Sequence, residues 1–477
     1  MIFNSIEYLI FLPTVFLLYW FVFNKSIRIQ NFLLLVVSYI FYGWWDWRFL
    51  SLIIFSSIID FYCGIYIEKE NTKKSKKRWL TLSMLINLGF LGLFKYFNFF
   101  SNSLAEAFFS LGYELDTLTL DIVLPVGISF YTFQTMSYTI DVYRGQLKPT
   151  KDPVAFFSFV SFFPQLVAGP IERATNLLPQ FYNERKFDII EAKDGLRQIL
   201  WGLFKKIVIA DNCAIIVNQV FDNYTDYSGS SLFIGAVFFA FQIYGDFSGY
   251  SDIAIGTARL FGFNLMQNFA FPYFSRDIAE FWRRWHISLT TWFRDYVYIP
   301  LGGSRGGTSM KVRNTFIIFI VSGFWHGANW TFIVWGVLNA LYFMPLLLLN
   351  KNRVNTNALA ANHFFVSPKA FFQIILTFLL TIIAWVFFRA PNVHTAFSYL
   401  LRMFNKSLLS VPQVSLKPMI FIILLLIIEW IQRNQKHGLE LNNVKLNKYI
   451  RWFIYYLLII IIFWFGAEKQ DFIYFQF

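Results

Sequence analysis

Apolar residues fill most of this chain in long runs separated by short polar segments. A transmembrane helix needs about 20 apolar residues to cross a hydrocarbon core about 30 Å thick. Runs of this kind occupy residues 6–23, 31–45, 49–67, 79–99, 122–142, 370–388, 417–430 and 449–465. On a window of about 19 residues, the pattern predicts an all-α, polytopic membrane bundle with roughly ten to twelve membrane segments.

Two further segments depart from this pattern. Residues 154–171 are apolar but short, and they contain two prolines and a glycine. Irregular backbone at membrane depth is tolerated where protein surrounds it, so this segment predicts a broken or re-entrant helix. Residues 188–211 mix apolar residues with basic ones, among them Lys205 and Lys206. That mixture is typical of an amphipathic helix that lies in the membrane interface.

The composition agrees with a membrane protein. Hydrophobic residues make up 57% and charged residues 14% of the 477 residues, whereas soluble proteins hold about 45–50% apolar and about 25% charged residues. Too few polar side chains are present to cover a soluble body of this length. No Pro/Ser-rich linker divides the apolar runs, which predicts one membrane domain over residues 1–477. Two cysteines, Cys63 and Cys213, make neither a disulfide framework nor a metal site.

The net charge of +13 comes with basic loops that alternate with an acidic one. Loops 73–78 and 144–151 are basic and fall on one side by the parity of the runs, and the acidic loop 101–121 falls on the other. The positive-inside rule places the basic loops in the cytoplasm and the amino terminus outside it. No basic stripe stands on a soluble face, which argues against nucleic-acid binding.

The polar stretch over residues 244–330 is the part of the chain least like a lipid-facing helix. It holds two of the five histidines, His286 and His326. His326 lies within residues 316–335, a run apolar enough to reach membrane depth. An ionisable side chain is costly at that depth, so a functional role is the first hypothesis for His326.

These histidines suggest proton transfer rather than metal chemistry. The chain has no Gly-rich phosphate loop, no paired cysteines and no His-Glu-x-x-His motif, so metal chemistry has no recognisable ligand set. A neutral imidazole can take a proton near neutral pH. A hydroxyl group brought to His326 could lose its proton as it attacks an activated acyl group. The developing oxyanion could be supported by a backbone N–H, or by His286, Ser288 or Asn329.

Structural roles are open for the same residues. His326 could donate a hydrogen bond to a carbonyl between packed helices, and His286 could face lipid headgroups beside two arginines. Arg294 and Asp295 could belong to an ion-pair network, and Asp246 could cap a buried helix. The tryptophans of the stretch are typical first of packing and of the membrane interface.

Four linked motifs resemble those of the membrane-bound O-acyltransferase (MBOAT) family. They read Asp-Phe-Ser-Gly-Tyr-Ser-Asp from Asp246, Phe-Trp-Arg-Arg-Trp-His-Ile-Ser-Leu from Phe281, Trp-Phe-Arg-Asp-Tyr-Val-Tyr-Ile-Pro-Leu-Gly-Gly from Trp292, and Phe-Trp-His-Gly-Ala-Asn-Trp from Phe324. The order of the motifs makes the signal specific, and the likeness covers essentially the full length. Within the family, the chain is similar to the branch of the alginate O-acetyltransferase membrane subunit and the peptidoglycan O-acetyltransferases.

The resemblance implies an all-helical bundle with a central tunnel that moves acyl groups, usually from a thioester, to hydroxyl acceptors. It implies cytoplasmic acetyl-CoA as the acyl donor, no metal, and an extracytoplasmic polysaccharide at a bacterial cytoplasmic membrane as the acceptor. The acetyl group would pass directly or through an extracytoplasmic acetyltransferase partner. The signature histidines of the family map onto His326, the catalytic base, and His286. The residues expected to bind substrate or support catalysis are Trp325, Asn329, Ser288, Arg294, Asp295 and Asp246.

Other functions are open to the sequence. A relative that passes D-alanine from a carrier protein to teichoic acid shares the histidine and the general plan. Broken helices with Gly and Pro at membrane depth are also found in transporters, and a scaffold for a glycan-modifying complex is a third hypothesis. Acyl transfer would require His326, whereas a transporter would tolerate its loss if transport does not run through it. A scaffold would turn over no acyl-CoA.

Overall fold

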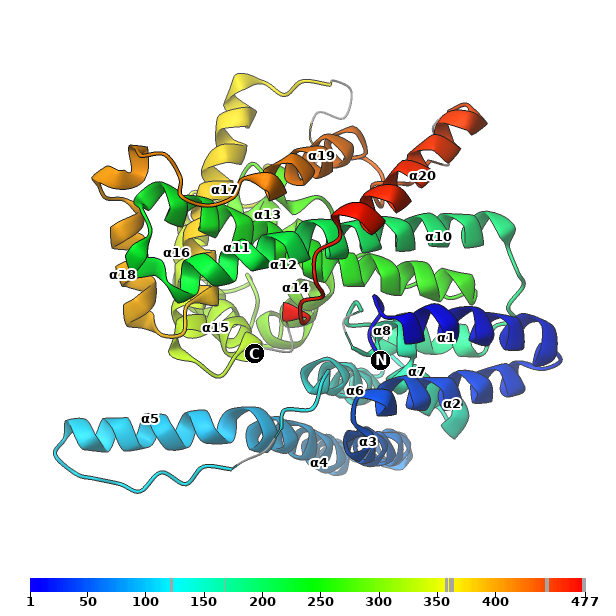
Figure 1. The fold of residues 1–477 in the computed structure, drawn as a ribbon. Helices are drawn as coiled ribbons and strands as arrows, with labels where there is room; N and C mark the ends of the chain where they lie inside the picture. Colours follow the sequence, from blue (N-terminus) through cyan, green and yellow to red (C-terminus); the bar gives the residue numbers. More distant parts are fainter. Residues whose placement is uncertain (121–122, 168, 357–358, 360–363, 442–445, 474–477) are drawn as a thin grey trace. The chain divides into compact units, whose positions relative to one another are not determined.

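The computed structural model describes residues 1–120, 123–167, 169–356, 359, 364–441 and 446–473. These residues form α-helices with short 3-10 and π segments between them, and no strand occurs among them, which confirms the predicted all-α class (Figure 1). The helices are α1 (Ile6–Leu17), α2 (Ile27–Asp46), α3 (Leu50–Lys69), α4 (Lys73–Leu91), α5 (Phe97–Ser110), α6 (Ile128–Tyr143), α7 (Pro153–Ser161), α8 (Phe163–Leu166), α9 (Ala174–Leu177), α10 (Ile189–Leu203), α11 (Asp211–Asp222), α12 (Gly229–Leu260), α13 (Ile278–Arg284), α14 (Ile287–Phe293), α15 (Thr308–His326), α16 (Trp330–Leu348), α17 (Pro368–Arg389), α18 (Val393–Met403), α19 (Lys417–Ile431) and α20 (Lys448–Phe465).

Backbone contacts divide the chain into two compact units. Unit 1 comprises residues 1–192 and 257–265, and unit 2 comprises residues 193–256 and 266–477. Helix α12 contributes to both units. Every candidate site residue lies in unit 2. The single membrane domain over residues 1–477 stays a prediction.

Capping residues set where many helices begin. The side chains of Ser26, Thr72 and Asn329 each accept a backbone N–H from the first turn of α2, α4 and α16. A helix start leaves four backbone N–H groups without a partner inside the helix. Each cap satisfies one of them and contributes about 1 kcal/mol. Local sequence thus fixes helix starts that hydrophobic runs alone leave uncertain.

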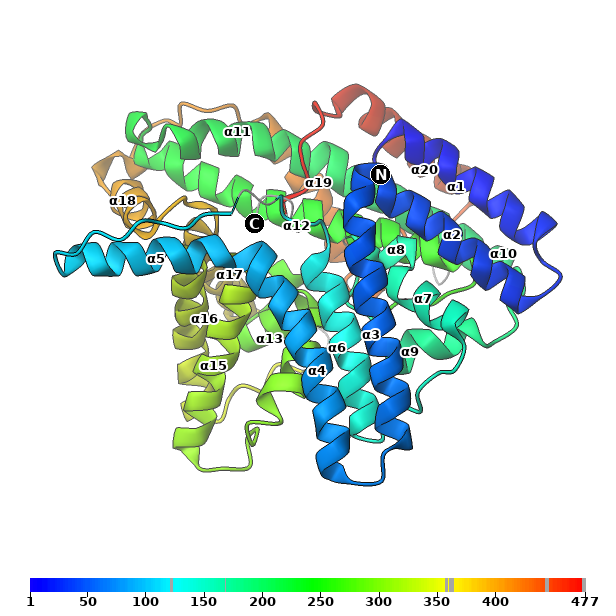
Figure 2. The same cartoon turned by 90° about the horizontal axis from the view of Figure 1, so that it is seen from below.

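In unit 1, a buried polar cluster joins α3, α4 and α6, which lie side by side in Figure 2. Asp60 of α3 accepts hydrogen bonds from Ser83 Oγ at 2.5 Å and from Asn87 Nδ2 at 2.9 Å, both on α4. The hydroxyl of Ser83 also lies 3.0 Å from that of Thr139 on α6. Helices in lipid gain no hydrophobic energy by associating, so such hydrogen bonds and close packing hold them together.

The predicted broken helix is present in unit 1. Helices α7 and α8 meet at Phe162, whose ψ of 106° leaves the helical region. Phe162 and Pro164 are buried, so protein surrounds the break, as irregular backbone at membrane depth requires. Residue 168 of the expected segment lies outside the described residues.

The prediction of an interfacial helix over residues 188–211 is wrong for its second half. Helix α10 continues into a π-helix, Phe204–Ala210. There Lys205 and Lys206 are only 3% and 1% exposed. Their ammonium groups form ion pairs with Asp252 and Asp246 of α12. These lysines therefore face the protein interior and not lipid headgroups.

The apolar run around His326 is two helices and not one segment. Helix α15 ends at His326, the backbone is extended at Gly327, and α16 begins at Trp330 under the Asn329 cap. The two helices pack without intervening side chains. A Cβ on Gly323 would lie 2.2 Å from the Phe332 carbonyl oxygen, and one on Gly336 would lie 2.4 Å from the Phe319 carbonyl oxygen. Small residues permit this approach of two backbones.

Six helical stretches among the described residues are long and apolar enough to cross a membrane. They are Ile27–Lys69, Lys73–Ser110, Gly229–Leu260, Trp330–Leu348, Pro368–Arg389 and Lys448–Phe465. The first two each contain two helices, α2 with α3 and α4 with α5, and α5 continues to Ser110 rather than ending at Phe99. Shorter apolar helices occupy Ile6–Val22 and Pro153–Leu166. The number of ten to twelve segments and the central tunnel stay predictions.

We expect Gly336→Ala to lower the thermal midpoint of the purified protein in detergent. The new methyl group would overlap the Phe319 carbonyl at 2.4 Å, and overpacking of this kind costs typically about 1–3 kcal/mol. Gly89→Ala in α4 is the matched control because a Cβ there meets nothing within 4 Å. Alanine favours a helix over glycine by about 1 kcal/mol, so the control should keep or raise the midpoint. A Gly336→Ala protein as stable as the control would contradict the close approach.

Candidate functional site

The two histidines of the central stretch lie beside each other in unit 2. His286 precedes α14 and His326 ends α15. They are 1% and 3% exposed, and their ring centroids are 6.5 Å apart. This spacing is too long for a direct hydrogen bond between the rings. The fold therefore brings together the two residues that the sequence singled out.

Aromatic rings enclose both imidazoles. Trp325 lies 5.0 Å from His326 and 6.2 Å from His286, measured between ring centroids. Trp335 and Phe388 lie 5.2 Å and 5.3 Å from His326. Phe247 lies 4.6 Å from His286, edge to face. This surrounding is apolar, and burial of that kind favours the neutral form of an imidazole.

Asn268, a residue that sequence reasoning missed, holds His286. Its Oδ1 lies 3.1 Å from His286 Nδ1 and accepts hydrogen bonds from the Ser288 backbone N–H at 3.3 Å and from Ser288 Oγ at 2.9 Å. Its Nδ2 donates to Ser251 Oγ on α12 at 3.1 Å. Ser288 Oγ also lies 3.4 Å from His286 Nδ1, so the three residues form one cluster. Support of catalysis by Ser288 stays a prediction. Asn268 stands in an irregular segment with no motif around it, so no sequence signal marks it.

Asp246 is not a helix cap, the structural alternative left open by the sequence. It lies in the middle of α12 and pairs with Lys206 at 2.8 Å. Lys206 also pairs with Asp211 at 2.8 Å, and the neighbouring Lys205 pairs with Asp252 at 2.6 Å. These three ion pairs are buried, so little solvent screens their charges. The next residue on α12, Phe247, contacts His286. Support of catalysis by Asp246 stays a prediction.

Three other expected support residues have structural partners. Asn329 accepts the Thr331 backbone N–H at 3.0 Å and donates to the Pro391 carbonyl at 2.9 Å. Arg294 and Asp295 pair with each other at 2.6 Å, and the Arg294 side chain is 57% exposed. Direct support of catalysis by Asn329 or Asp295 stays a prediction.

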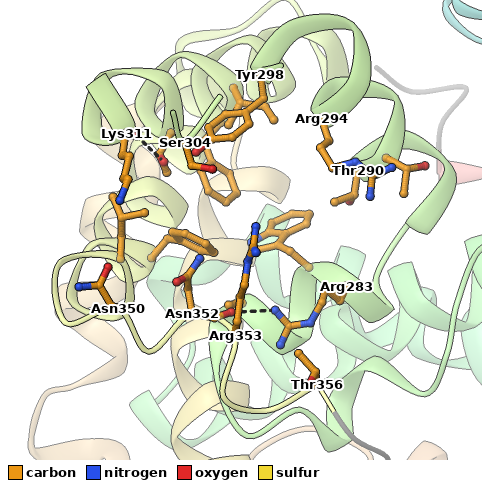
Figure 3. Close-up of a pocket in the computed structure, with 18 of the residues that line it drawn as sticks. Arg283, Thr290, Arg294, Tyr298, Ser304, Lys311, Asn350, Asn352, Arg353 and Thr356 are labelled. Carbon is orange, nitrogen blue, oxygen red and sulfur yellow. Dashed lines mark hydrogen bonds between the residues drawn. The ribbon is translucent and has the colours of Figure 1, made fainter. Parts of the chain in front are cut away.

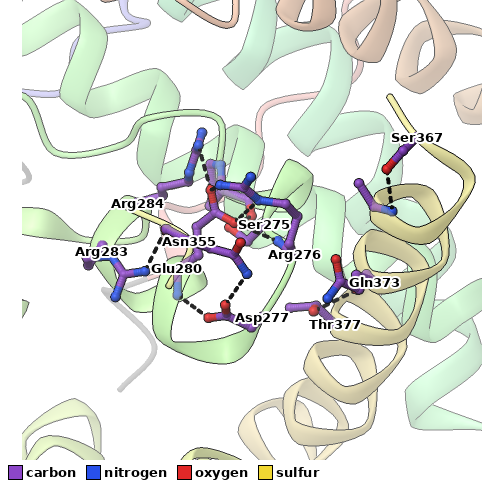
Figure 4. A network of polar contacts seen from close by, with 12 residues as sticks. Ser275, Arg276, Asp277, Glu280, Arg283, Arg284, Asn355, Ser367, Gln373 and Thr377 are labelled. Carbon is purple, nitrogen blue, oxygen red and sulfur yellow. Dashed lines mark hydrogen bonds and ion pairs between the residues drawn. The ribbon is translucent and has the colours of Figure 1, made fainter. Parts of the chain in front are cut away.

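Ion pairs fix α13, the helix that leads into His286 (Figure 4). Glu280 accepts hydrogen bonds from Arg276 Nε at 2.9 Å and from Arg284 at 2.8 Å. Burial alone would raise the pKa of Glu280, but the Arg276 hydrogen bond and the Arg284 charge outweigh it and lower that pKa. Asp277 caps α13 and accepts a hydrogen bond from Asn355 at 2.6 Å. The carboxylates of α13 are therefore structural.

A cavity of about 750 Å³ is lined by residues of α13, α14, α15, α16 and the segment after α16 (Figure 3). Its basic lining residues are Arg283, Arg294, Lys311 and Arg353, and no carboxylate is found among the described lining residues. The lining includes Ile287, which follows His286 in the chain, and Trp282, whose ring lies 5.6 Å from that of Trp335. Trp335 thus packs against both Trp282, which lines the cavity, and His326, whose ring centroid lies 5.2 Å from that of Trp335.

The cavity is cationic at every physiological pH. The hydrogen bond with Asp295 raises the pKa of Arg294, and arginine does not lose its proton in proteins. Sequence reasoning missed this cavity, although a signal existed. Lys311 and Arg353 flank two apolar helices joined by a short turn, which places both basic ends on the same side.

The described part of the chain holds no group of three His, Cys, Asp or Glu side chains placed to bind a metal ion. The expectation that the protein works without a metal is not tested by this finding and stays a prediction.

Residues 150–387 match the sequence model of the membrane-bound O-acyltransferase family, MBOAT. The chain is 42% identical over 398 residues to the probable alginate O-acetylase AlgI of Pseudomonas syringae pv. tomato, which covers 83% of this chain and 74% of the relative. It is 36% identical over 418 residues to the peptidoglycan O-acetyltransferase of Helicobacter pylori, covering 82% and 77%. The teichoic acid D-alanyltransferase of Streptococcus thermophilus is 31% identical over 235 residues, covering 45% and 55%.

We expect Lys206→Met to destabilise the protein strongly, because Asp211 and Asp246 would then be buried without their shared cation. Removing one partner of a buried ion pair costs about 3–5 kcal/mol. The measurement is the thermal midpoint in detergent.

Arg48→Met is the matched control for Lys206→Met. Arg48 pairs with Asp46 at 2.6 Å, but its side chain is 69% exposed, and surface ion pairs contribute about 0–1 kcal/mol. Equal midpoints for the two variants would contradict the structural importance of the buried network.

Proposed function

Because the chain belongs to the membrane-bound O-acyltransferase family and is a multi-pass membrane O-acyltransferase, we propose that it moves acetyl groups from cytoplasmic acetyl-CoA to hydroxyl groups of an extracytoplasmic polysaccharide. The acetyl group passes to the polysaccharide directly or through an extracytoplasmic partner protein. The single observation that carries the proposal is the pair of buried histidine rings, 6.5 Å apart, in the same unit as a cationic cavity.

His326 is the general base in this proposal. A hydroxyl oxygen attacks the thioester carbon, its proton passes to the imidazole of His326, and the carbon–sulfur bond breaks to release the CoA thiolate. The thiolate then takes up the proton that His326 received. The aromatic surroundings of His326 support this role because they exclude water and favour a neutral ring. Trp325 contacts both imidazoles and would confine the acyl group between them.

The cationic cavity is the proposed binding site of the donor. CoA carries a pyrophosphate and a 3′-phosphate on its adenosine end, and a thioester at the end of a long pantetheine arm. Arginine and lysine are the usual partners of phosphate groups. The Lys311, Arg353 and Arg283 side chains would hold the phosphates (Figure 3), and the arm would bring the thioester past Trp282 to the histidines.

The orientation in the membrane supports a cytoplasmic donor. Lys311 lies in the first turn of α15 and Arg353 follows α16, so both stand at the open end of one helical hairpin. The positive-inside rule places this end in the cytoplasm. We propose that the basic segments 73–78 and 144–151 also lie in the cytoplasm. The amino terminus then lies on the extracytoplasmic side of the membrane. Asp121, part of the opposing acidic loop, lies outside the described residues.

The acceptor class is proposed from the relatives. Those that match over 82–83% of this chain are named for acetylation of alginate or peptidoglycan, whereas the D-alanyltransferase matches over 45%. We therefore favour acetyl over D-alanyl transfer. A carrier-protein donor would also bring a phosphate on its pantetheine arm, so the cavity alone does not choose between the two donors.

We expect His326→Ala to abolish release of CoA from labelled acetyl-CoA by the protein in nanodiscs, while its thermal midpoint stays measurable. Loss of a general base costs typically about 10²–10⁴-fold in rate. His394→Ala is the matched control because His394 stands exposed on α18.

Equal activity in wild type and His326→Ala would overturn the assignment of the base. A wild type without turnover would lead us to test carrier-protein thioesters. Absence of turnover with every thioester would favour a transporter or scaffold.

We expect Arg353→Gln and Lys311→Gln to raise the KM for acetyl-CoA by roughly 10-fold or more, because hydrogen bonds to charged groups are worth about 1.5–3 kcal/mol. Acetyl-pantetheine lacks the phosphates, so its turnover should not change in these variants. Arg305→Gln is the control, since Arg305 is exposed and does not line the cavity. Equal losses with both donors would show that the cavity does not bind the phosphates.

A further inference from the structure

The segment that carries His286 is held in an unusual backbone conformation. His286 has φ 44° and ψ 55°, the left-handed region that L residues rarely adopt. The next two residues are tied to Asn268: the Ile287 N–H donates to the Asn268 carbonyl at 2.9 Å, and the Ser288 N–H donates to Asn268 Oδ1 at 3.3 Å. Strain of this kind persists where surrounding contacts determine the conformation, and it is concentrated at functional sites.

These contacts determine the orientation of the Asn268 amide. A backbone N–H can only donate, so the atom of Asn268 that faces the Ser288 N–H is the oxygen and not the nitrogen. The nitrogen then faces Ser251 Oγ at 3.1 Å, where it donates. The orientation follows from hydrogen-bond chemistry and not from the placement of hydrogen atoms.

The amide oxygen in turn decides the tautomer of His286. Asn268 Oδ1 lies 3.1 Å from Nδ1 of the imidazole. Ser288 Oγ, which lies 3.4 Å from Nδ1, donates its own proton to Oδ1 at 2.9 Å and so presents a lone pair to the ring. Two acceptors 3.1 Å apart would repel each other, so Nδ1 carries the proton and donates it to Oδ1. In the neutral ring, Nε2 is then a lone-pair acceptor. Nε2 is also buried and has no hydrogen-bond partner within the described protein, which is rare for a buried polar atom unless it serves a function.

We propose that Asn268 is a positioning residue that keeps the His286 proton on Nδ1, so that Nε2 accepts a hydrogen bond from a substrate hydroxyl or amide N–H beside His326. The inference rests on the proposed acyl transfer. It revises one expectation from the sequence, since a neutral His286 in this tautomer has no N–H left to support an oxyanion. The substrate donor is either the acceptor hydroxyl or an amide of the pantetheine arm.

The first test determines the tautomer directly. The protein labelled with ¹⁵N-histidine is studied in lipid by solid-state NMR, and the His286 signal is assigned by its loss in His286→Gln. We expect a protonated Nδ1 and an unprotonated Nε2 in wild type, and a change in this pattern in Asn268→Leu. A proton on Nε2 of His286 in wild type would overturn the proposal. This readout needs no turnover, so it decides the proposal even if acetyl-CoA proves not to be the donor.

The second test uses the pH profile of acetyl-CoA turnover. In Asn268→Asp, a carboxylate would still accept the Nδ1 proton but would also stabilise the imidazolium form of His286. The acid limb of kcat should therefore move to higher pH by about one to three units, the usual effect of an adjacent opposite charge. The other titratable ring beside His286 is His326. We expect substitution of His326 to remove activity, so the shift of the acid limb is measured in proteins that keep His326.

Two further variants separate positioning from folding. Asn268→Leu removes the acceptor and should lower kcat by roughly 10-fold to 100-fold, as loss of an orienting partner does at other sites. Asn223→Asp is the control for the charge change because Asn223 is an exposed residue after α11, and it should leave the pH profile unchanged. An Asn268→Leu protein with the wild-type rate, or an Asn268→Asp protein with the wild-type pH profile, would overturn the positioning role.

The substrate donor is identified by comparing truncated acyl donors. If the pantetheine amide is the partner of Nε2, Asn268→Leu should lower turnover of acetyl-pantetheine but not of S-acetyl-cysteamine analogues that lack that amide. If the acceptor hydroxyl is the partner, both donors should be affected to the same extent.

Discussion

The burial of charge in an apolar helix bundle is the constraint on which unit 2 depends. Lys205 and Lys206 are almost fully buried, and each would be costly without a carboxylate within a few ångströms. Asp252 and Asp246 on α12 meet them at 2.6 Å and 2.8 Å. The pairs form because α10 and α12 approach at glycines, where a Cβ on Gly249 would lie 2.8 Å from the Gly202 carbonyl oxygen. Charge pairing therefore fixes both the spacing and the rotation of α12.

The rotation of α12 decides what faces the histidines. With its aspartates directed at the lysines, α12 places Phe247 against His286 and Ser251 against the Asn268 amide. The same helix thus connects a structural ion network with the ring and the hydrogen bond that hold His286. A left-handed residue costs about 1–2 kcal/mol, and these contacts offset that cost. His326 is held differently, by two helices whose glycines allow their backbones to touch.

Sequence periodicity predicted the apolar helices of this chain well, because burial in lipid demands long runs of apolar residues. It did not predict how polar groups would be satisfied. Lys205 and Lys206 looked interfacial because their partners, Asp252 and Asp246, are distant in sequence. Likewise, residues 316–335 looked like one segment because a turn of three residues, closed by the Asn329 cap, does not interrupt the hydropathy.

In the candidate site, too, the sequence predicted some features and not others. The two histidines were found because an ionisable side chain in an apolar run is conspicuous, and their motifs resemble those of a known family. Asn268 was missed because its importance comes from where its amide oxygen stands relative to His286 Nδ1 and Ser288. No regular spacing of residues along the sequence predicts such a role. It becomes visible only once backbone from α12, the following loop and α14 is placed together.

The site joins two environments with opposite chemical preferences. The cavity around Lys311 and Arg353 is cationic and suits a hydrated, anionic ligand, whereas the histidine rings lie among tryptophan and phenylalanine side chains that exclude water. Electrostatic interactions strengthen as water is removed, and the free energy cost of placing a charge among these aromatic side chains rises as well. A donor with a charged handle and a neutral reactive end matches both regions at once. Helices α13 and α14 connect the two regions, because Trp282 and Ile287 line the cavity and His286 lies between them in the chain. In the proposed function, binding energy gained at the phosphates would hold the neutral thioester in a dry place that the phosphates themselves could not enter.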